Sequence, residues 1–162
     1  MIGIKSIAAY MPKQSIDNIA QGATFGESEE FIRTKIGATK IPRKDKMEET
    51  SDLAAAAVRK LTEGSALETE HIDALIVVTQ NGDGSGLPHT AAVVQDRLEL
   101  ESNVAAFDVS LGCSGYVYGL TILKGFIQEA GLKNGVLVTA DPFSQRMVAA
   151  AKIWRYGTGR WR

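Results

Sequence analysis

The sequence holds few of the residues that build disulfides and metal centres. Its 162 residues include one cysteine, Cys113, and two histidines, His71 and His89. A single cysteine cannot form an intramolecular disulfide, and one cysteine with two histidines does not give zinc-finger spacing. We therefore expect no bound metal and no disulfide framework, which favours a reducing, cytoplasmic setting.

The chain also lacks a charge excess and a long apolar run. Its formal net charge is −1, so no global basic field would recruit nucleic acid or anionic lipid. The opening MIGIKSIAAYMPK has no cationic region followed by a long apolar stretch. No run reaches the roughly 18 apolar residues of a membrane span. These absences predict a soluble cytoplasmic protein with no nucleic-acid or membrane partner.

What is present is an ordinary globular composition with an unusual end. Hydrophobic residues make up 44% and charged residues 23% of the chain, which excludes fibrous and low-complexity classes. Residues 1–145 carry all 19 acidic side chains and sum to −6. Residues 146–162 carry five basic side chains, both tryptophans and no acid. We therefore divide the chain into a folded part, 1–145, and an atypical basic tail, 146–162.

Strand and helix patterns alternate along the folded part. Apolar runs such as ALIVVT at 74–79, bounded by polar residues, indicate strands that are covered on both faces. Helical spacing recurs in segments that begin at capping residues and end at glycine. The expected strands are 2–10, 74–79, 104–109 and 136–140, and the expected helices are 28–37, 50–64, 90–98 and 113–130. This order predicts an α/β fold with a mixed, mostly parallel sheet and helices on both faces.

The segment SLGCSGYVYGL places Cys113 at the step from a strand into a long helix, between Gly112 and Gly115. Such an elbow lifts a side chain off the sheet edge, and a helix amino terminus stabilises a thiolate by roughly 0.3–1 kcal/mol. Thioester exchange would be the natural reaction. Spacing alone favours the alternative, a small inert cysteine buried at a tight turn. Six residues of the helix expected at 113–130 share one side by their spacing: Cys113, Tyr116, Val117, Leu120, Leu123 and Ile127.

The residues around Cys113 resemble a segment of a known protein family. FDVSLGCSGYVYGL resembles the active-site segment of the β-ketoacyl-acyl-carrier-protein synthase III family, in the thiolase superfamily. Four further elements occur in the family's order: EEFIRTKIGA, ETSDLAAAAV, IDALIVVTQ and LPHTAAVVQDRL. GVLVTAD resembles the strand that closes the first half of the family's fold. The resemblance implies a thiolase-like half-domain.

By this resemblance, Cys113 would be the nucleophile that takes an acyl group from coenzyme A, and its backbone N–H would be one oxyanion donor. Ser114 and Gly115 of the same motif would contact the substrate. Phe31 and Lys35 would lie at the mouth of the substrate tunnel, where a basic side chain holds a phosphopantetheine or nucleotide phosphate. The alternative for Lys35 is plain solvation.

Leu87 takes the place where the family often has a phenylalanine that crosses a dimer interface. The resemblance therefore implies a homodimer, with acyl-CoA and acyl carrier protein as its other partners and no metal or redox cofactor. A leucine there would admit a longer or branched acyl chain. The alternative for Leu87 is loop packing.

The resemblance also implies that a second, similar half is missing. In the family that half supplies the histidine and asparagine used in condensation with malonyl carrier protein, and a glycine amide that completes the oxyanion hole. His71 and His89 both precede Cys113 and match neither motif. Losing one oxyanion donor typically costs about a hundredfold to a thousandfold in rate. We expect slow self-acylation of this chain and no full turnover.

A shifted reading frame would explain the tail. The codons of Ile-Trp-Arg at 153–155, advanced by one base, can encode Phe or Tyr, then Gly, then Asp, and the family continues with Phe-Gly-Asp-Gly-Ala. The alternative is a basic amphipathic helix, but the apolar residues of the tail form no clean stripe.

Three functions stay open. The first is the amino-terminal half of a synthase III-like acyltransferase of fatty-acid or related biosynthesis, with Cys113 as the acyl acceptor. The second is a non-catalytic truncated homologue that binds a carrier protein or a complete partner. The third is another thiolase-superfamily synthase, of polyketide or secondary metabolism.

Overall fold

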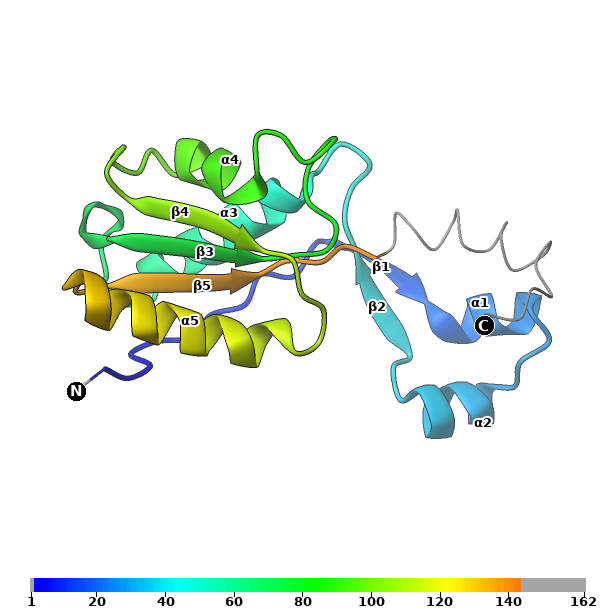
Figure 1. Ribbon diagram of the computed structural model, residues 1–162. Helices are drawn as coiled ribbons and strands as arrows, with labels where there is room; N and C mark the ends of the chain where they lie inside the picture. Colours follow the sequence, from blue (N-terminus) through cyan, green and yellow to red (C-terminus); the bar gives the residue numbers. More distant parts are fainter. Residues whose placement is uncertain (1, 144–162) are drawn as a thin grey trace, which may run out of the picture. The chain divides into compact units, whose positions relative to one another are not determined.

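A computed structural model describes residues 2–143 of the chain (Figure 1). These residues divide into two compact units. The sheet unit comprises residues 2–10 and 48–142, and the small unit comprises residues 11–47 together with Phe143. The tail predicted at 146–162 lies outside the described residues.

The sheet unit is a three-stranded parallel sheet with helices on both faces (Figure 1). Its strands are β3 (Ala74–Val78), β4 (Ala105–Val109) and β5 (Gly135–Thr139), in the order β4-β3-β5. Helices α3 (Thr50–Glu63) and α4 (Thr90–Arg97) cover one face and α5 (Gly115–Ala130) covers the other, while η2 (Thr69–His71) leads into β3. The predicted α/β class, with parallel strands and helices on both faces, is confirmed.

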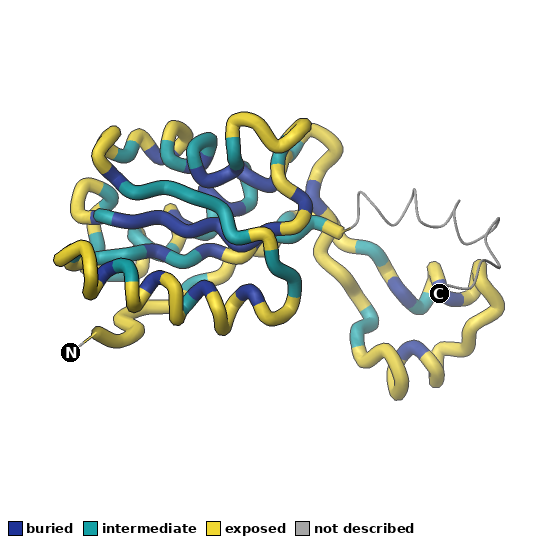
Figure 2. Tube along the Cα trace, in the orientation of Figure 1, coloured by how far each residue is buried: buried dark blue, intermediate teal, exposed yellow. Residues whose placement is uncertain are grey.

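The core lies on both sides of β3, which is buried along its whole length (Figure 2). Because side chains alternate along a strand, Leu75 and Val77 face one helix layer and Ala74 and Ile76 face the other. The first set packs with α3 and α4, and the second packs with Leu123 and other side chains of α5. This two-sided burial explains why the strand is an uninterrupted apolar run.

The small unit pairs two short antiparallel strands, β1 (Gln14–Asp17) and β2 (Lys40–Arg43). Between them lie α1 (Asn18–Thr24), α2 (Glu29–Phe31) and the π-helical turn η1 (Ile32–Ile36). The predicted helix at 28–37 is confirmed as α2 with η1. Ser28 Oγ accepts a hydrogen bond from the Phe31 N–H at 3.1 Å, and Gly37 ends the turn with a left-handed φ of 76°.

The predicted strand at residues 2–10 is wrong. The segment carries no strand, and its three isoleucines are exposed, with Ile7 at 77%. A strand requires a neighbour for its backbone groups, and within the described sheet β3 has β4 and β5 as its two neighbours while this segment pairs with neither. Apolar alternation alone therefore did not produce a strand here.

The residues that spacing placed on one side of the helix are only partly on the buried side of α5. Tyr116 and Val117 are exposed, at 47% and 65%, whereas Leu123 and Ile127 are buried as predicted. The buried stripe consists of Gly115, Gly119, Leu123 and Ile127. None of the helices within the described residues has both the length and the hydropathy of a membrane span.

Candidate functional site

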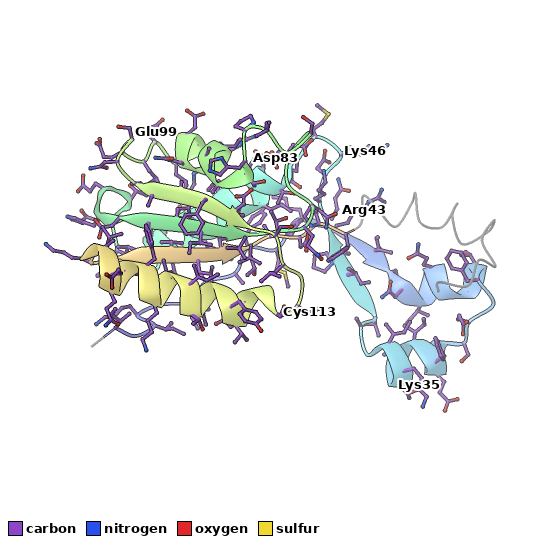
Figure 3. All side chains as sticks on the ribbon, viewed as in Figure 1. Lys35, Arg43, Lys46, Asp83, Glu99 and Cys113 are labelled. Carbon is purple, nitrogen blue, oxygen red and sulfur yellow. The ribbon has the colours of Figure 1, made fainter. Side chains whose placement is uncertain are left out.

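Cys113 lies at the edge of the sheet where the three parallel strands end. It stands in the short connection between β4, which ends at Val109, and α5, which begins at Gly115 (Figure 3). Its thiol is exposed. In open parallel sheets this edge is where ligands bind. The structure therefore does not bury Cys113, and the reactivity of its thiol stays a prediction.

A tight turn and close helix packing set the position of the thiol. The Gly115 N–H donates to the Gly112 carbonyl at 2.8 Å, which closes a turn around Cys113 and Ser114. A Cβ on Gly115 would lie only 2.4 Å from Val78 Cγ1, so the start of α5 rests directly on the end of β3. Ser114 is the N-cap residue of α5 and is exposed beside Cys113. The sequence-predicted elbow is therefore present, with Cys113, Ser114 and Gly115 together.

Asp141 ties the end of β5 to the end of β3 at the same edge. Its Oδ1 accepts hydrogen bonds from the Gln80 N–H at 3.2 Å and from the Asn81 side-chain amide. The Asn81 carbonyl in turn accepts from the Thr50 hydroxyl, at the start of α3. The partners of Asp141 lie about sixty positions away in the sequence, so no local motif identified Asp141 as a residue of this site.

Two more aspartates hold helix amino termini by non-local capping. Asp108, in β4, accepts from the Thr90 N–H at 2.8 Å and the Ala91 N–H at 2.7 Å, where α4 begins. Asp83 accepts from the Ser51 N–H at 2.9 Å, where α3 begins. Asp108, the aspartate of the Phe-Asp pair in the motif, therefore has a structural role, because a carboxylate near a helix amino terminus satisfies unpaired N–H groups.

Neither histidine supplies a base to the thiol. His89 Nε2 lies 3.0 Å from the Ala106 carbonyl oxygen, in the middle of β4. His71 lies just before β3, at the opposite edge of the sheet, with Nδ1 3.7 Å from a Glu68 carboxylate oxygen. Within residues 2–143, Cys113 therefore has no hydrogen-bonded general base, and the site as described offers a nucleophile without an activating partner.

The remaining predicted substrate residues lie on other segments. Leu87 is 86% exposed, in the glycine-rich loop between β3 and α4. Phe31 and Lys35 are both exposed in the small unit, on the consecutive turns α2 and η1. The structure therefore brings Ser114 and Gly115 to Cys113, and the roles of Phe31, Lys35 and Leu87 stay predictions.

The opposite edge of the sheet carries an acidic group and a well-held carboxylate. Glu68, Glu70 and His71 have ligand atoms within 4.8 Å of one another, but all three are exposed. Asp73 accepts hydrogen bonds from the Asn134 and Lys133 N–H groups, both at 2.8 Å, and these bonds hold the pKa of its carboxyl below the ordinary value. Asp73 thereby joins the start of β3 to the start of β5.

The chain matches known proteins over most of its described length. A family model for 3-oxoacyl-[acyl-carrier-protein] synthase III matches residues 107–152, which include the elbow and α5. The β-ketoacyl-[acyl-carrier-protein] synthase III of Clostridioides difficile (strain 630) is 38% identical over 143 residues, which are 88% of this chain and 43% of that protein. The chain thus spans less than half the length of that relative.

Solved structures give the same result. A crystal structure of a 3-oxoacyl-(acyl-carrier-protein) synthase III matches with a TM-score of 0.81 and 35% identity, over 86% of this chain and 41% of that one. The synthase III structure from Thermus thermophilus matches with a TM-score of 0.80 and 32% identity, over 89% of this chain and 44% of that one. The chain therefore belongs to the β-ketoacyl-[acyl-carrier-protein] synthase III family and corresponds to the amino-terminal half of its members.

Proposed function

We propose that this chain is the nucleophile-bearing half of an acyltransferase, in which Cys113 accepts an acyl group from acyl-CoA before condensation with malonyl carrier protein. The observation that carries the proposal is the exposed Cys113 on a tight turn at the start of α5, within the motif that matches the synthase family. The pathway would be fatty-acid or related biosynthesis, in the cytoplasm.

The proposed first step is thioester exchange. The Cys113 sulfur forms a bond to the thioester carbonyl carbon, the bond from that carbon to the coenzyme A sulfur breaks, and the proton of the cysteine passes to the released thiol. The backbone N–H of Cys113 would stabilise the developing oxyanion. The exchange balances without any oxidant, reductant or metal, so the proposal includes no cofactor.

The condensing step needs groups that the described residues do not bring to the thiol. His89 and His71 are held elsewhere in the sheet unit. Without a base and a second oxyanion donor, we expect acylation that is about a hundredfold to a thousandfold slower than in a complete site. We further propose that acyl carrier protein is the second substrate and that the protein acts as a homodimer.

Intact-mass spectrometry after incubation with acyl-CoA tests the proposal. A single acyl adduct that hydroxylamine removes at neutral pH, and that is absent from Cys113→Ala, would support it, because hydroxylamine cleaves thioesters and spares lysine amides. Because Cys113 is the only cysteine, this variant removes every thiol and is a complete control. A thiol that reacts with a maleimide yet never takes up an acyl group would contradict the proposal and favour a non-catalytic binding partner.

A further inference from the structure

The side chain of Gln80, in the loop after β3, lies against the turn that contains Cys113. Gln80 is the second residue after β3, and its backbone N–H donates to Asp141 Oδ1 at 3.2 Å, which holds it at the carboxyl edge of the sheet. A Cβ on Gly112 would lie 2.9 Å from Gln80 Oε1 and 3.5 Å from its Cδ. The carboxamide therefore rests on the residue that precedes Cys113.

The glycine at 112 is what allows this contact. Any side chain there would meet the carboxamide head, so the absence of a Cβ leaves Gln80 seated beside the nucleophile. Gln80 and Cys113 are both exposed, and the Gln80 carboxamide contacts Gly112, the chain neighbour of Cys113. Within residues 2–143, the Gln80 side chain has no hydrogen-bond partner of its own.

We propose that Gln80 is a specificity-determining residue that selects acyl groups with a hydroxyl or carbonyl oxygen close to the thioester over plain alkyl groups of the same length. This inference rests on the proposed acyl transfer to Cys113. A carboxamide offers one acceptor oxygen and two N–H donors, so it can pair with either kind of oxygen.

The physical reason is that alkyl and oxygen-bearing acyl groups differ in the free-energy cost of removing the carboxamide from water. An alkyl chain that lies over Gln80 removes its polar head from water and returns no hydrogen bond, which is unfavourable. An acyl group with a hydroxyl or keto oxygen restores that hydrogen bond. The carboxamide carries no charge that could offset the desolvation of an ionised group, so the preferred substituent is polar and uncharged rather than a carboxylate or phosphate.

The test compares acyl groups of equal length. We would measure acylation of Cys113 by intact mass with 3-hydroxybutyryl-CoA and with butyryl-CoA, and take the ratio of the two rates. Gln80→Met keeps the length of an unbranched side chain and removes its hydrogen-bonding atoms. The matched control is Gln128→Met, because Gln128 is an exposed glutamine near the far end of α5.

The ratio in the wild-type chain should fall by about threefold to tenfold in Gln80→Met, as the loss of one hydrogen bond predicts, and should not change in Gln128→Met. If acylation occurs and the ratio is the same in all three proteins, the role of Gln80 is overturned while the proposed function stands. If Gln80→Met changes the rates with 3-hydroxybutyryl-CoA and butyryl-CoA by the same factor, the role of Gln80 in selection is likewise overturned.

A second reaction separates the two proposals when no acyl adduct forms. N-(2-hydroxyethyl)maleimide and N-propylmaleimide have substituents of equal length and alkylate the thiol without acyl transfer. A lower rate ratio in Gln80→Met than in Gln128→Met supports selection by Gln80 even where the acyltransferase proposal has failed. An unchanged ratio overturns it.

Discussion

A methyl group at Gly115 would test how directly the seating of α5 controls the cysteine turn. The added Cβ would lie 2.4 Å from Val78 Cγ1 and 3.1 Å from Leu111 Cβ, whereas ordinary contacts begin at 3.4 Å. Val78 is buried in the central strand, and its β-branched side chain has little rotamer freedom. The start of α5 must therefore move outward by about 1 Å, and overpacking of this kind costs about 1–3 kcal/mol.

Two other glycines of the same helix provide matched comparisons. A Cβ on Gly125 would meet nothing within 4 Å, so Gly125→Ala should stabilise the chain by about 1 kcal/mol through helix propensity. A Cβ on Gly119 would lie 2.7 Å from Leu137 Cδ1, the end of a flexible side chain, and 3.2 Å from Val78 Cγ2. Gly119→Ala should therefore fall between the other two variants.

Urea unfolding and thiol reactivity together measure the effect. We expect Gly115→Ala to be about 2–4 kcal/mol less stable than Gly125→Ala, since the overpacking and propensity effects have opposite signs. We also expect the rate at which Cys113 reacts with a small disulfide reagent to change in Gly115→Ala alone. If Gly115→Ala and Gly125→Ala were equally stable, the close approach of α5 to β3 would be refuted.

Two further outcomes follow from the carboxylates of Asp108 and Asp73. Asp108→Ala should destabilise the chain by about 1–2 kcal/mol, measured by urea unfolding, because it removes the cap of α4. Asp73→Asn should also destabilise at neutral pH. Because the folded-state pKa of Asp73 is lowered, its contribution is present above about pH 4 and is lost as the pH falls through the folded-state value, so unfolding curves at pH 6 should separate wild type from variant more than curves at pH 3.

The sequence analysis succeeded where the signal was local and long. The strand predicted at 74–79 is β3, Ala74–Val78, because two-sided burial demands a continuous apolar run. Helix ends were found by chemistry that acts within one turn, since Gly37 and Gly131 both adopt left-handed φ values where helices were predicted to stop. Cys113 was found because glycine, strand and helix signals meet at one point.

The elements and residues that the sequence analysis failed to predict depend on partners that are distant in the sequence. Strands β1 and β2 are four residues each, largely polar, and depend on each other, with Asp17 opposite Lys40. The segment 2–10 has the apolar alternation of a strand and lacks the neighbour. Asp141 and Asp108 were missed as positioning residues because their partners lie far away in sequence. Propensity is therefore a weak guide wherever a partner decides the outcome.

Cys113 and its predicted recognition residues belong to different compact units. Every contact that fixes the turn around Cys113, from Val78 to Asp141, belongs to the sheet unit, whereas Phe31 and Lys35 belong to the small unit. Substitutions such as Lys35→Ala should then weaken saturation by coenzyme A thioesters and leave the reaction of the thiol with a small reagent unchanged. The turn around Cys113 is thus a property of one compact unit, and the proposed substrate contacts of Phe31 and Lys35 belong to the other.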